Sequence, residues 1–205
     1  MSKHAFPWQQ IVLATKNKGK IKEFSRMFDR FDVEVLTIAD LSGLPDVVED
    51  GDTFEANARK KAETICRTTG LPSLADDSGL EVEALNGEPG VYSARFAGPH
   101  ATDAENNAKL VDKMQHVPEA ARQARFVSVL ALAVPGGETL LARGTCEGRI
   151  VLAPKGDHGF GYDPYFFLPE KGKTMAELVP EEKNRISHRG AAVRVLENML
   201  AERFS

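Results

Sequence analysis

The chain has 205 residues, and its composition, 42% hydrophobic and 27% charged, is ordinary for a soluble protein. A formal net charge of -4 gives no overall attraction to nucleic acid or to an anionic membrane, so an anionic ligand needs a local cluster of positive charge. The longest apolar stretch, residues 126–134, is far too short to span a bilayer, and residues 1–20 contain no signal-peptide core.

The two cysteines, Cys66 and Cys146, lie far apart in the sequence and show no C-x-x-C spacing. This usage favours a reduced, cytoplasmic protein in which both cysteines are packing residues rather than metal ligands or nucleophiles. Neither a nucleic-acid partner nor a membrane is expected.

In the first half of the chain, strand and helix patterns alternate. The patterns predict a buried strand at 9–14, a helix at about 18–30, a half-buried strand at 33–38 and a loop at 39–52. A second helix is expected to begin after Thr53 as N-cap and to end near Thr69, where Gly70 and Pro72 stop it.

The second half begins with two strand-like segments, "PSLA" and "LEVEAL", on either side of "DDSG". Further on, the patterns predict a glycine-rich loop at 86–98, a helix from Thr102 to about His116, a hairpin at 124–151, a short strand, a short helix capped by Thr174 and a final helix at 187–204 capped by Ser187. Helices and strands are mixed throughout, so the predicted class is α/β. The hairpin, which turns at Pro135-Gly136-Gly137, favours a mixed sheet over a purely parallel one.

A polar loop joins the first strand to the first helix. It contains Thr15, Lys16, Asn17, Lys18, Gly19 and Lys20. A loop in this place presents backbone N–H groups and a helix N-terminus to an anion, and its lysines add positive charge. The pattern is not a Walker A loop. The spacing alone favours a simpler interpretation, a solvated basic turn in which Asn17 is the helix N-cap.

Adjacent carboxylates, Asp76 and Asp77, follow an apolar run. Side chains alternate across a strand, so the two cannot face the same side if the strand continues. Carboxylates at the end of a buried strand are costly without a cation or N–H partners, and Mg²⁺ bound together with substrate phosphates would be such a cation. The alternative is an Asx-type turn at "DDSG". Glu49 could reach the same cation, whereas Asp52 is explained as a residue that favours the next helix N-terminus.

Two later segments could recognise a nucleotide base. The first contains Phe160, Gly161, Tyr162 and Asp163, and the second contains Lys183, His188 and Arg189. Aromatic side chains on a glycine loop can stack on a base, and basic side chains can reach its oxygen atoms. The alternatives are a turn that buries two rings at the edge of a core, and a capped helix with exposed charges. Taken together, the anion donors, carboxylates, aromatic loop and basic cluster predict a Mg²⁺–nucleotide site.

The sequence resembles the Ham1-like family of non-canonical purine nucleoside triphosphate pyrophosphatases. The matching segments occur in family order from residue 11 to about 200: "LATKNKGKIKEF", "GDTFEANARKKA", "LADDSGLEVEALNGEPGVYSARFAG", "GFGYDPYFF" and "EEKNRISHRGAA". The resemblance implies one domain over residues 1–205, with a long mixed sheet, flanking helices and a cleft between two lobes. It also implies a homodimer that hydrolyses ITP, dITP and XTP to the monophosphate and pyrophosphate with Mg²⁺.

The resemblance also implies roles for individual residues. The loop "TKNKGK" would hold the triphosphate, chiefly through Thr15, Asn17 and Lys20, and Lys61 would add charge. Glu49 and Asp77 would bind Mg²⁺, with Asp77 as the general base and Asp76 in support or as a further ligand. Ser78 would touch the substrate. The base would lie among Phe160, Gly161, Tyr162, Asp163, Lys183, His188 and Arg189.

Two other functions stay open from the sequence. One is a related pyrophosphatase for another modified nucleotide, such as a pyrimidine. The other is a nucleotide sensor without catalysis, against which the intact set of carboxylates argues. One departure from the family pattern is Ala56, which stands where many relatives have Glu, so no acidic contribution is expected there.

Overall fold

The computed structural model describes residues 7–204. The first six residues, part of the segment in which the sequence predicts no signal-peptide core, lie outside the described residues. Seven strands form one sheet in the order β2-β1-β3-β4-β5-β6-β7. The strands are β1 (Gln10–Leu13), β2 (Glu34–Thr37), β3 (Ser73–Val82), β4 (Gln123–Ala133), β5 (Leu140–Ile150), β6 (Phe166–Leu168) and β7 (Lys173–Thr174).

The sheet is mixed, as the sequence predicts. β1 pairs in parallel with both β2 and β3, whereas β6 pairs antiparallel with β5 and β7. β4 and β5 are neighbours joined by a short turn, which confirms the predicted hairpin. The α-helices are α1 (Lys18–Phe28), α2 (Phe54–Thr69), α3 (Asp103–Met114), α4 (Pro180–Ile186) and α5 (His188–Phe204). The α/β class is therefore confirmed.

The chain forms two compact units. The first comprises Met1–Asp77, Ser128–Gly144 and Arg189–Ser205, and the second comprises Ser78–Val127 and Thr145–His188. Three strands, β3, β4 and β5, each contribute residues to both units. The cleft between two lobes that the family resemblance implies stays a prediction.

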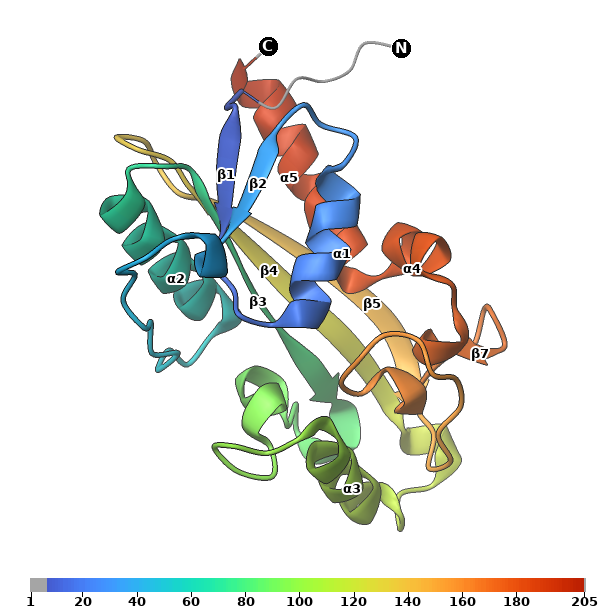
Figure 1. Ribbon diagram of the computed structural model, residues 1–205. Helices are drawn as coiled ribbons and strands as arrows, with labels where there is room; N and C mark the ends of the chain where they lie inside the picture. The colour runs from blue at the N-terminus through green and yellow to red at the C-terminus, as the bar shows by residue number, and fades with distance from the viewer. Residues whose placement is uncertain (1–6, 205) are drawn as a thin grey trace. The chain divides into compact units, whose positions relative to one another are not determined.

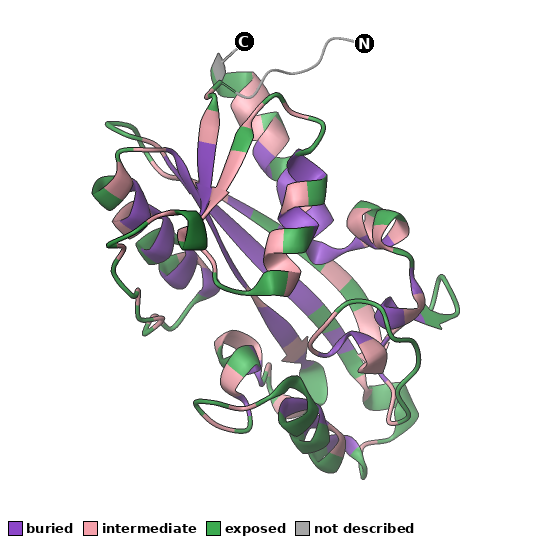
Figure 2. Ribbon diagram, in the orientation of Figure 1, coloured by how far each residue is buried: buried purple, intermediate pink, exposed green. Residues whose placement is uncertain are grey.

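In the first unit, two helices cover one face of the sheet. Phe24 and Phe28 of α1 and Leu196 of α5 form a core with Ile11 and Leu13 of β1. Figure 1 shows α1 and α5 on one side of the strands and α2 on the other. Figure 2 shows the buried residues along the strands and on the helix faces that meet them. Because the strand residues alternate in direction, apolar runs such as "IVL" supply both covered faces.

Helix α2 begins and ends where the sequence predicts. The Thr53 side chain accepts a hydrogen bond from the backbone N–H of Ala56 at 3.1 Å, so Thr53 is the N-cap. Gly70 follows the last turn with φ of 70°, a left-handed conformation that glycine adopts without steric cost. This helix carries Lys61, one of the predicted phosphate-binding residues.

The second unit has its own core. Leu110 and Met114 of α3 pack with Phe126 of β4, Ile150 of β5 and Phe166 of β6. Helix α3 opens with a capping box, in which the Thr102 side chain and Glu105 satisfy each other's backbone N–H groups. The helix predicted after Thr102 is thus confirmed, with its end at Met114 rather than His116.

The interruption predicted at "DDSG" is wrong. β3 runs without a break from Ser73 to Val82, so Asp76 and Asp77 lie inside a strand and no Asx-type turn forms. The strand continues because the polar side chains find partners beside it, as described below for Asp76, and the backbone keeps its strand conformation. The two aspartates therefore face opposite sides of the sheet.

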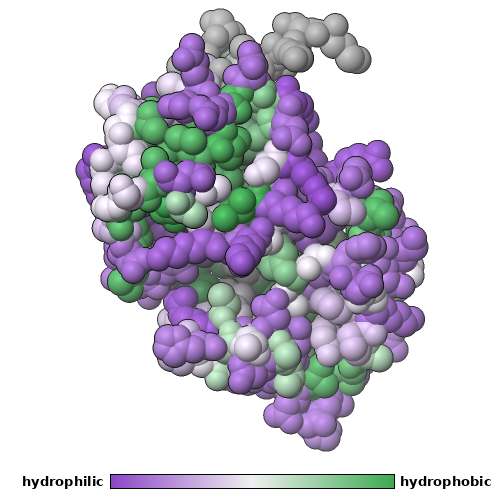
Figure 3. Space-filling model, viewed as in Figure 1, coloured by the Kyte–Doolittle hydropathy of each residue, from purple (hydrophilic) through white to green (hydrophobic). Residues whose placement is uncertain are grey.

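On the surface of the first unit, hydrophobic side chains gather over β1 and β2 in the view of Figure 3. Leu36 and Ile38 in this region are only half-buried. Within residues 7–204, no helix is long and apolar enough to cross a membrane. Both cysteines are free thiols, and burial raises the pKa of each, to about 11 for Cys146, which agrees with their expected role in packing.

Candidate active site

The predicted site residues form one group in each unit. The first unit holds the residues expected to bind phosphate and metal, namely Thr15–Lys20, Glu49, Lys61, Asp76 and Asp77, together with Arg189. The second unit holds most of those expected to bind the base, namely Phe160, Gly161, Tyr162, Asp163, Lys183 and His188, together with Ser78.

The loop between β1 and α1 ends in a capped helix N-terminus. Asn17 is the N-cap, as predicted, because its Oδ1 accepts from the backbone N–H of Lys20 at 3.0 Å. Thr15 Oγ1 accepts from the backbone N–H of Asn17 at 3.2 Å. Lys16 and Lys18 are exposed, and Lys16 forms an ion pair with Asp46. The first turn of α1 presents further N–H groups, which suits a bound anion.

Asp76 is buried among positive charges. Its Oδ2 lies 2.8 Å from Lys20 Nζ and 3.6 Å from Arg189 Nε, and its Oδ1 accepts from Ser128 Oγ at 2.5 Å. Burial by itself would raise the pKa of Asp76, but Lys20 and Arg189 outweigh it and hold this pKa below its usual range. Asp76 is thus an ionised carboxylate that fixes the Lys20 ammonium group.

Lys61 extends this cluster from α2. Its Nζ donates to the backbone carbonyl of Asp76 at 2.8 Å and forms an ion pair with the carboxylate of Glu49. Lys61 is buried, whereas the neighbouring Lys60 is exposed and pairs with Asp50. A cavity of about 200 Å³ is lined in part by Thr15, Lys16, Glu49 and Lys61.

Asp77, on the other side of β3, is 95% buried, with a relative exposure of 5%. Its side chain has a hydrogen bond with Asn57, and its Oδ2 is buried without a hydrogen-bond partner among the described residues. Burial raises the pKa of Asp77 to about 6, and the nearby charge of Glu49 adds to the rise while Lys61 opposes it. Asp77 therefore keeps one oxygen available to a ligand or a proton.

Sequence reasoning missed Asn57 on α2. Its Oδ1 accepts from the backbone N–H of Gly51 at 2.8 Å, and its Nδ2 donates to the Gly51 carbonyl at 3.4 Å. A Cβ on Gly51 would lie 2.7 Å from that Oδ1, so a larger residue would displace the Asn57 side chain. Asn57 thus joins the loop of Glu49 to Asp77. The available signal was an Asn inside a helix, where its intrinsic propensity is low.

Glu49 and Asp77 are the residues that fit a divalent cation. Within residues 7–204, no three His, Cys, Asp or Glu side chains group as a metal site. Mg²⁺ nevertheless needs only one or two protein carboxylates when substrate phosphates complete its shell. The unpartnered Oδ2 of Asp77 beside the charge of Glu49 suits this arrangement, whereas Asp76 already contacts Lys20 and Ser128.

In the second unit, Asp163 organises the aromatic loop. Its Oδ2 accepts from the backbone N–H of Phe160 at 3.0 Å and lies 2.7 Å from Lys183 Nζ. Lys183 Nζ also lies 5.1 Å from the centroid of the Phe160 ring, within the range of a cation–π contact. Gly159 is required here, because a Cβ would lie 2.1 Å from Asp163 Oδ2. An aromatic face and an ammonium group are thus held side by side.

The two aromatic side chains of this loop differ in exposure. Tyr162 is buried and donates from its hydroxyl to the Ser93 carbonyl at 2.6 Å, and burial raises its pKa. Phe160 is only half-buried. The alternative of a turn that buries rings therefore holds for Tyr162, which anchors the loop, and leaves Phe160 as the ring that can stack on a ligand.

The basic residues at the start of α5 are buried, so the alternative of a capped helix with exposed charges is wrong. His188 stacks on Phe126 with ring centroids 4.7 Å apart. Arg189 donates from its Nη1 to Glu23 Oε2 at 2.9 Å. Glu23 on α1 is a further residue that sequence reasoning missed. Its buried carboxylate fixes the position of Arg189.

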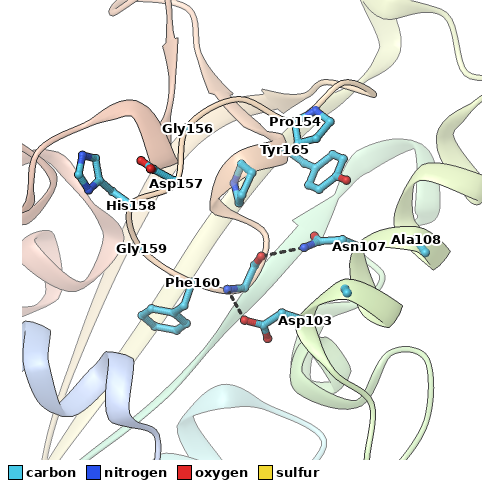
Figure 4. Close-up of a pocket in the computed structure, with 13 residues that line it drawn as sticks. Asp103, Asn107, Ala108, Pro154, Gly156, Asp157, His158, Gly159, Phe160 and Tyr165 are labelled. Carbon is cyan, nitrogen blue, oxygen red and sulfur yellow. Dashed lines mark hydrogen bonds between the residues drawn. The ribbon is translucent and has the colours of Figure 1, made fainter.

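A cavity of about 460 Å³ lies beside the aromatic loop (Figure 4). It is lined by the first turns of α3 and by the segment around residues 154–165. Asp103 and Asn107 of α3 both form hydrogen bonds to the backbone of Gly161. These contacts could not be predicted from the sequence, because the partners are more than 50 positions apart in the chain.

The sequence is similar over most of its length to two bacterial pyrophosphatases. It is 52% identical over 194 residues to the dITP/XTP pyrophosphatase of Geobacillus kaustophilus, with 95% of each chain covered. It is also 52% identical over 188 residues to the dITP/XTP pyrophosphatase of Lactiplantibacillus plantarum, with 92% of this chain and 93% of the relative covered.

Solved structures agree in fold. The Staphylococcus aureus Ham1 protein superposes with a TM-score of 0.84 at 44% identity, covering 95% of this chain and 99% of that one. A HAM1 protein from Coxiella burnetii gives a TM-score of 0.85 at 42% identity, covering 95% and 100%. The sequence model of the Ham1 family matches residues 11–199. With the fold and the ordered motifs both in agreement, this chain belongs to the Ham1 family.

Proposed function

We propose that this protein hydrolyses non-canonical purine nucleoside triphosphates, such as ITP, dITP and XTP, to the monophosphate and pyrophosphate. The names of its relatives support this substrate class. The observation that carries the proposal is Asp77, a buried carboxylate with one unpartnered oxygen beside Lys61 and Lys20. Such a group can act on water next to a bound polyphosphate.

The triphosphate would bind to the positive groups of the first unit. Lys20 and Lys61, fixed by Asp76 and its carbonyl, supply two ammonium groups, and the N-terminus of α1 supplies backbone N–H groups. A water molecule that loses its proton becomes negatively charged as it attacks, and a polyanion repels that charge. Groups fixed before the reaction lower this barrier without having to reorganise.

Asp77 would accept a proton from the attacking water. In the metal-free protein, a pKa of about 6 leaves Asp77 mostly ionised at neutral pH, so its carboxylate can accept a proton or bind a cation. General-base help of this kind is worth roughly 10²–10⁴-fold in rate. Mg²⁺, held by Glu49 and Asp77, would supply charge neutralisation on the phosphate oxygens.

The base would stack on Phe160. Lys183 beside that ring is a donor suited to the 6-oxo group of hypoxanthine or xanthine, and buried His188 of the same unit would support the recognition. Adenine carries an amino group at this position, which leaves such a donor unpaired. Unpaired buried donors discriminate strongly against the wrong substrate.

Asp77→Asn tests the proposal. The amide keeps the shape of the side chain but cannot accept the proton, so kcat for ITP should fall by about 10²-fold or more. Asp112→Asn, the same change on the exposed face of α3, is the matched control and should leave kcat unchanged. Near-wild-type turnover by a folded Asp77→Asn protein would contradict the assignment of Asp77.

The assembly and location of the protein are part of the same proposal. We expect a homodimer from the family resemblance. We expect a cytoplasmic site of action from the two free cysteines. Sedimentation velocity on the purified chain measures the first directly. A sedimentation coefficient of a monomer at micromolar concentration would remove the dimer from the proposal.

A further inference from the structure

We propose that Asp103 and Asn107 are positioning residues for base selection, because they clamp both backbone polar groups of Gly161, the residue that follows Phe160. The inference rests on the proposed function, in which the Phe160 ring stacks on the base. It extends that function to two side chains of α3 that lie outside the loop itself.

The clamp holds both polar groups of a single residue. Asp103 Oδ2 accepts from the backbone N–H of Gly161 at 2.8 Å, and Asn107 Nδ2 donates to the Gly161 carbonyl at 2.9 Å. Figure 4 shows both bonds as dashed lines between α3 and the loop. The two side chains are four positions apart, so they lie on one face of the helix.

The loop needs such a clamp because of its glycines. Gly159 and Gly161 have φ of 78° and 64°, and glycine has a wide choice of other conformations. Asp163 holds the backbone N–H of Phe160 from within the loop. The α3 clamp holds the next residue from outside. The backbone of Phe160 is therefore held by Asp163 and by the α3 clamp, and the orientation of the Phe160 ring depends on both contacts.

Helix α3 is a suitable reference for this purpose. It is capped by the box of Thr102 and Glu105 at one end, and Leu110 and Met114 bury it in the core of the second unit. The backbone of its first turns is therefore held in place. A hydrogen bond from a side chain on these turns holds the loop in a fixed position relative to the core.

Asn107 lowers the stability of the fold if its only role is to fill space. It is buried, and its Oδ1 has no hydrogen-bond partner among residues 7–204. A buried polar atom without a partner destabilises a fold, and an apolar side chain would avoid that cost. The contribution of Asn107 is thus its Nδ2 bond to Gly161.

The neighbouring Asn106 offers a matched control. It is also buried on α3, and its side chain also bonds backbone groups, the N–H of Ala97 at 2.8 Å and the carbonyl of Ala94 at 3.1 Å. It does not bond Gly161. Asn106→Ala should therefore lower stability as Asn107→Ala does, without a change in base selection.

The experiment measures kcat and KM for ITP, XTP, GTP and ATP with Mg²⁺ in five proteins. These are the wild type, Asn107→Ala, Asp103→Ala, Asp103→Asn and Asn106→Ala. Loss of either clamp bond should raise KM for ITP about tenfold, with kcat within about threefold, and should lower the ITP-to-ATP ratio of kcat/KM, because the stacked base would no longer be held with its 6-oxo group toward Lys183. Asp103→Asn keeps an acceptor oxygen and should recover most of the loss.

Two results would overturn the clamp. One is wild-type KM and selectivity in folded Asn107→Ala and Asp103→Ala. The other is an equal loss of selectivity in Asn106→Ala, which would indicate a general structural effect. If the wild type turns over none of the nucleotides, the proposed function fails by itself. Calorimetric titration with IMP then tests the clamp separately, and equal or absent affinity in wild type and clamp variants would refute it.

Discussion

At the scale of single residues, the two adjacent aspartates have opposite environments. Asp76 lies among cations, which hold its pKa low, whereas burial raises the pKa of Asp77 to about 6. Their separation follows from the strand, which turns neighbouring side chains to opposite faces. Two identical carboxyl groups thus differ in role, one fixing Lys20 and the other available for chemistry.

Asp77 should lower the stability of the metal-free protein. Because its pKa is about 6 when folded and near 3.8 ordinarily, the folded state binds the proton more tightly. The free energy of unfolding therefore falls as pH rises from about 4 to 6 and stays low above that. At about 1.4 kcal/mol per pKa unit, Asp77→Asn should stabilise the fold by up to about 3 kcal/mol at pH 8.

Urea unfolding in EDTA measures this effect. The stability gap between Asp77→Asn and wild type should be widest at pH 8 and should narrow toward pH 5, where the wild-type carboxyl is protonated. A variant that is no more stable than wild type at pH 8, or a gap independent of pH, would show that the Asp77 carboxylate is not strained by burial.

Asp76→Asn should have the opposite effect on stability. It removes the carboxylate beside Lys20 and leaves Arg189 with Glu23 as its ion pair, and breaking a buried ion pair from one side costs about 3–5 kcal/mol. Chemical denaturation measures the loss. Asp46→Asn, which removes the exposed partner of Lys16, is the control and should change little. Wild-type stability in Asp76→Asn would mean that the two cations do not depend on Asp76.

Some of these residues were predictable and others were not. The carboxylates and lysines stand in recognisable motifs, so the sequence was enough to select Asp77 and Lys61 as candidates, and their roles stay predictions. Asn57, Glu23 and Asn107 were not selected from the sequence. Their partners lie elsewhere in the fold, as with the Gly161 carbonyl, 54 positions from Asn107. Only the folded chain brings them together.

At the scale of elements, local signals decided which predictions held. Thr53 and Gly70 mark both ends of α2, and capping depends on residues within one turn of each other, so the sequence is sufficient there. The prediction of a break in β3 was wrong because a run of polar residues is typical of a turn. Whether "DDSG" is a turn or a strand depends on Lys20 and Ser128, which are remote in sequence.

The N-cap of α2 should contribute measurably to stability. Thr53→Ala removes the hydrogen bond to the Ala56 N–H and should cost about 1 kcal/mol in urea unfolding. Thr53→Ser keeps the hydroxyl and should retain most of that stability. An Ala variant equal to the Ser variant would indicate that the cap is satisfied by solvent instead.

At the scale of the whole molecule, the charge distribution matters more than its sum. The chain is acidic overall, with a net charge of -4, and yet Lys20, Lys61 and Arg189 lie together around Asp76. The composition predicts no nucleic-acid partner. It could not show this local positive cluster, which requires the ordered motifs and the fold.

The most direct measurement is product analysis by ion-exchange chromatography. The purified protein is incubated with Mg²⁺ and, separately, with ITP, dITP, XTP, GTP and ATP. The proposed function predicts IMP and pyrophosphate from ITP, with little consumption of GTP or ATP. Formation of IDP and phosphate would contradict the proposed function, because the bond between the β- and γ-phosphates would then be cleaved. If none of the five nucleotides is turned over, the protein acts on another nucleotide or binds nucleotides without catalysis.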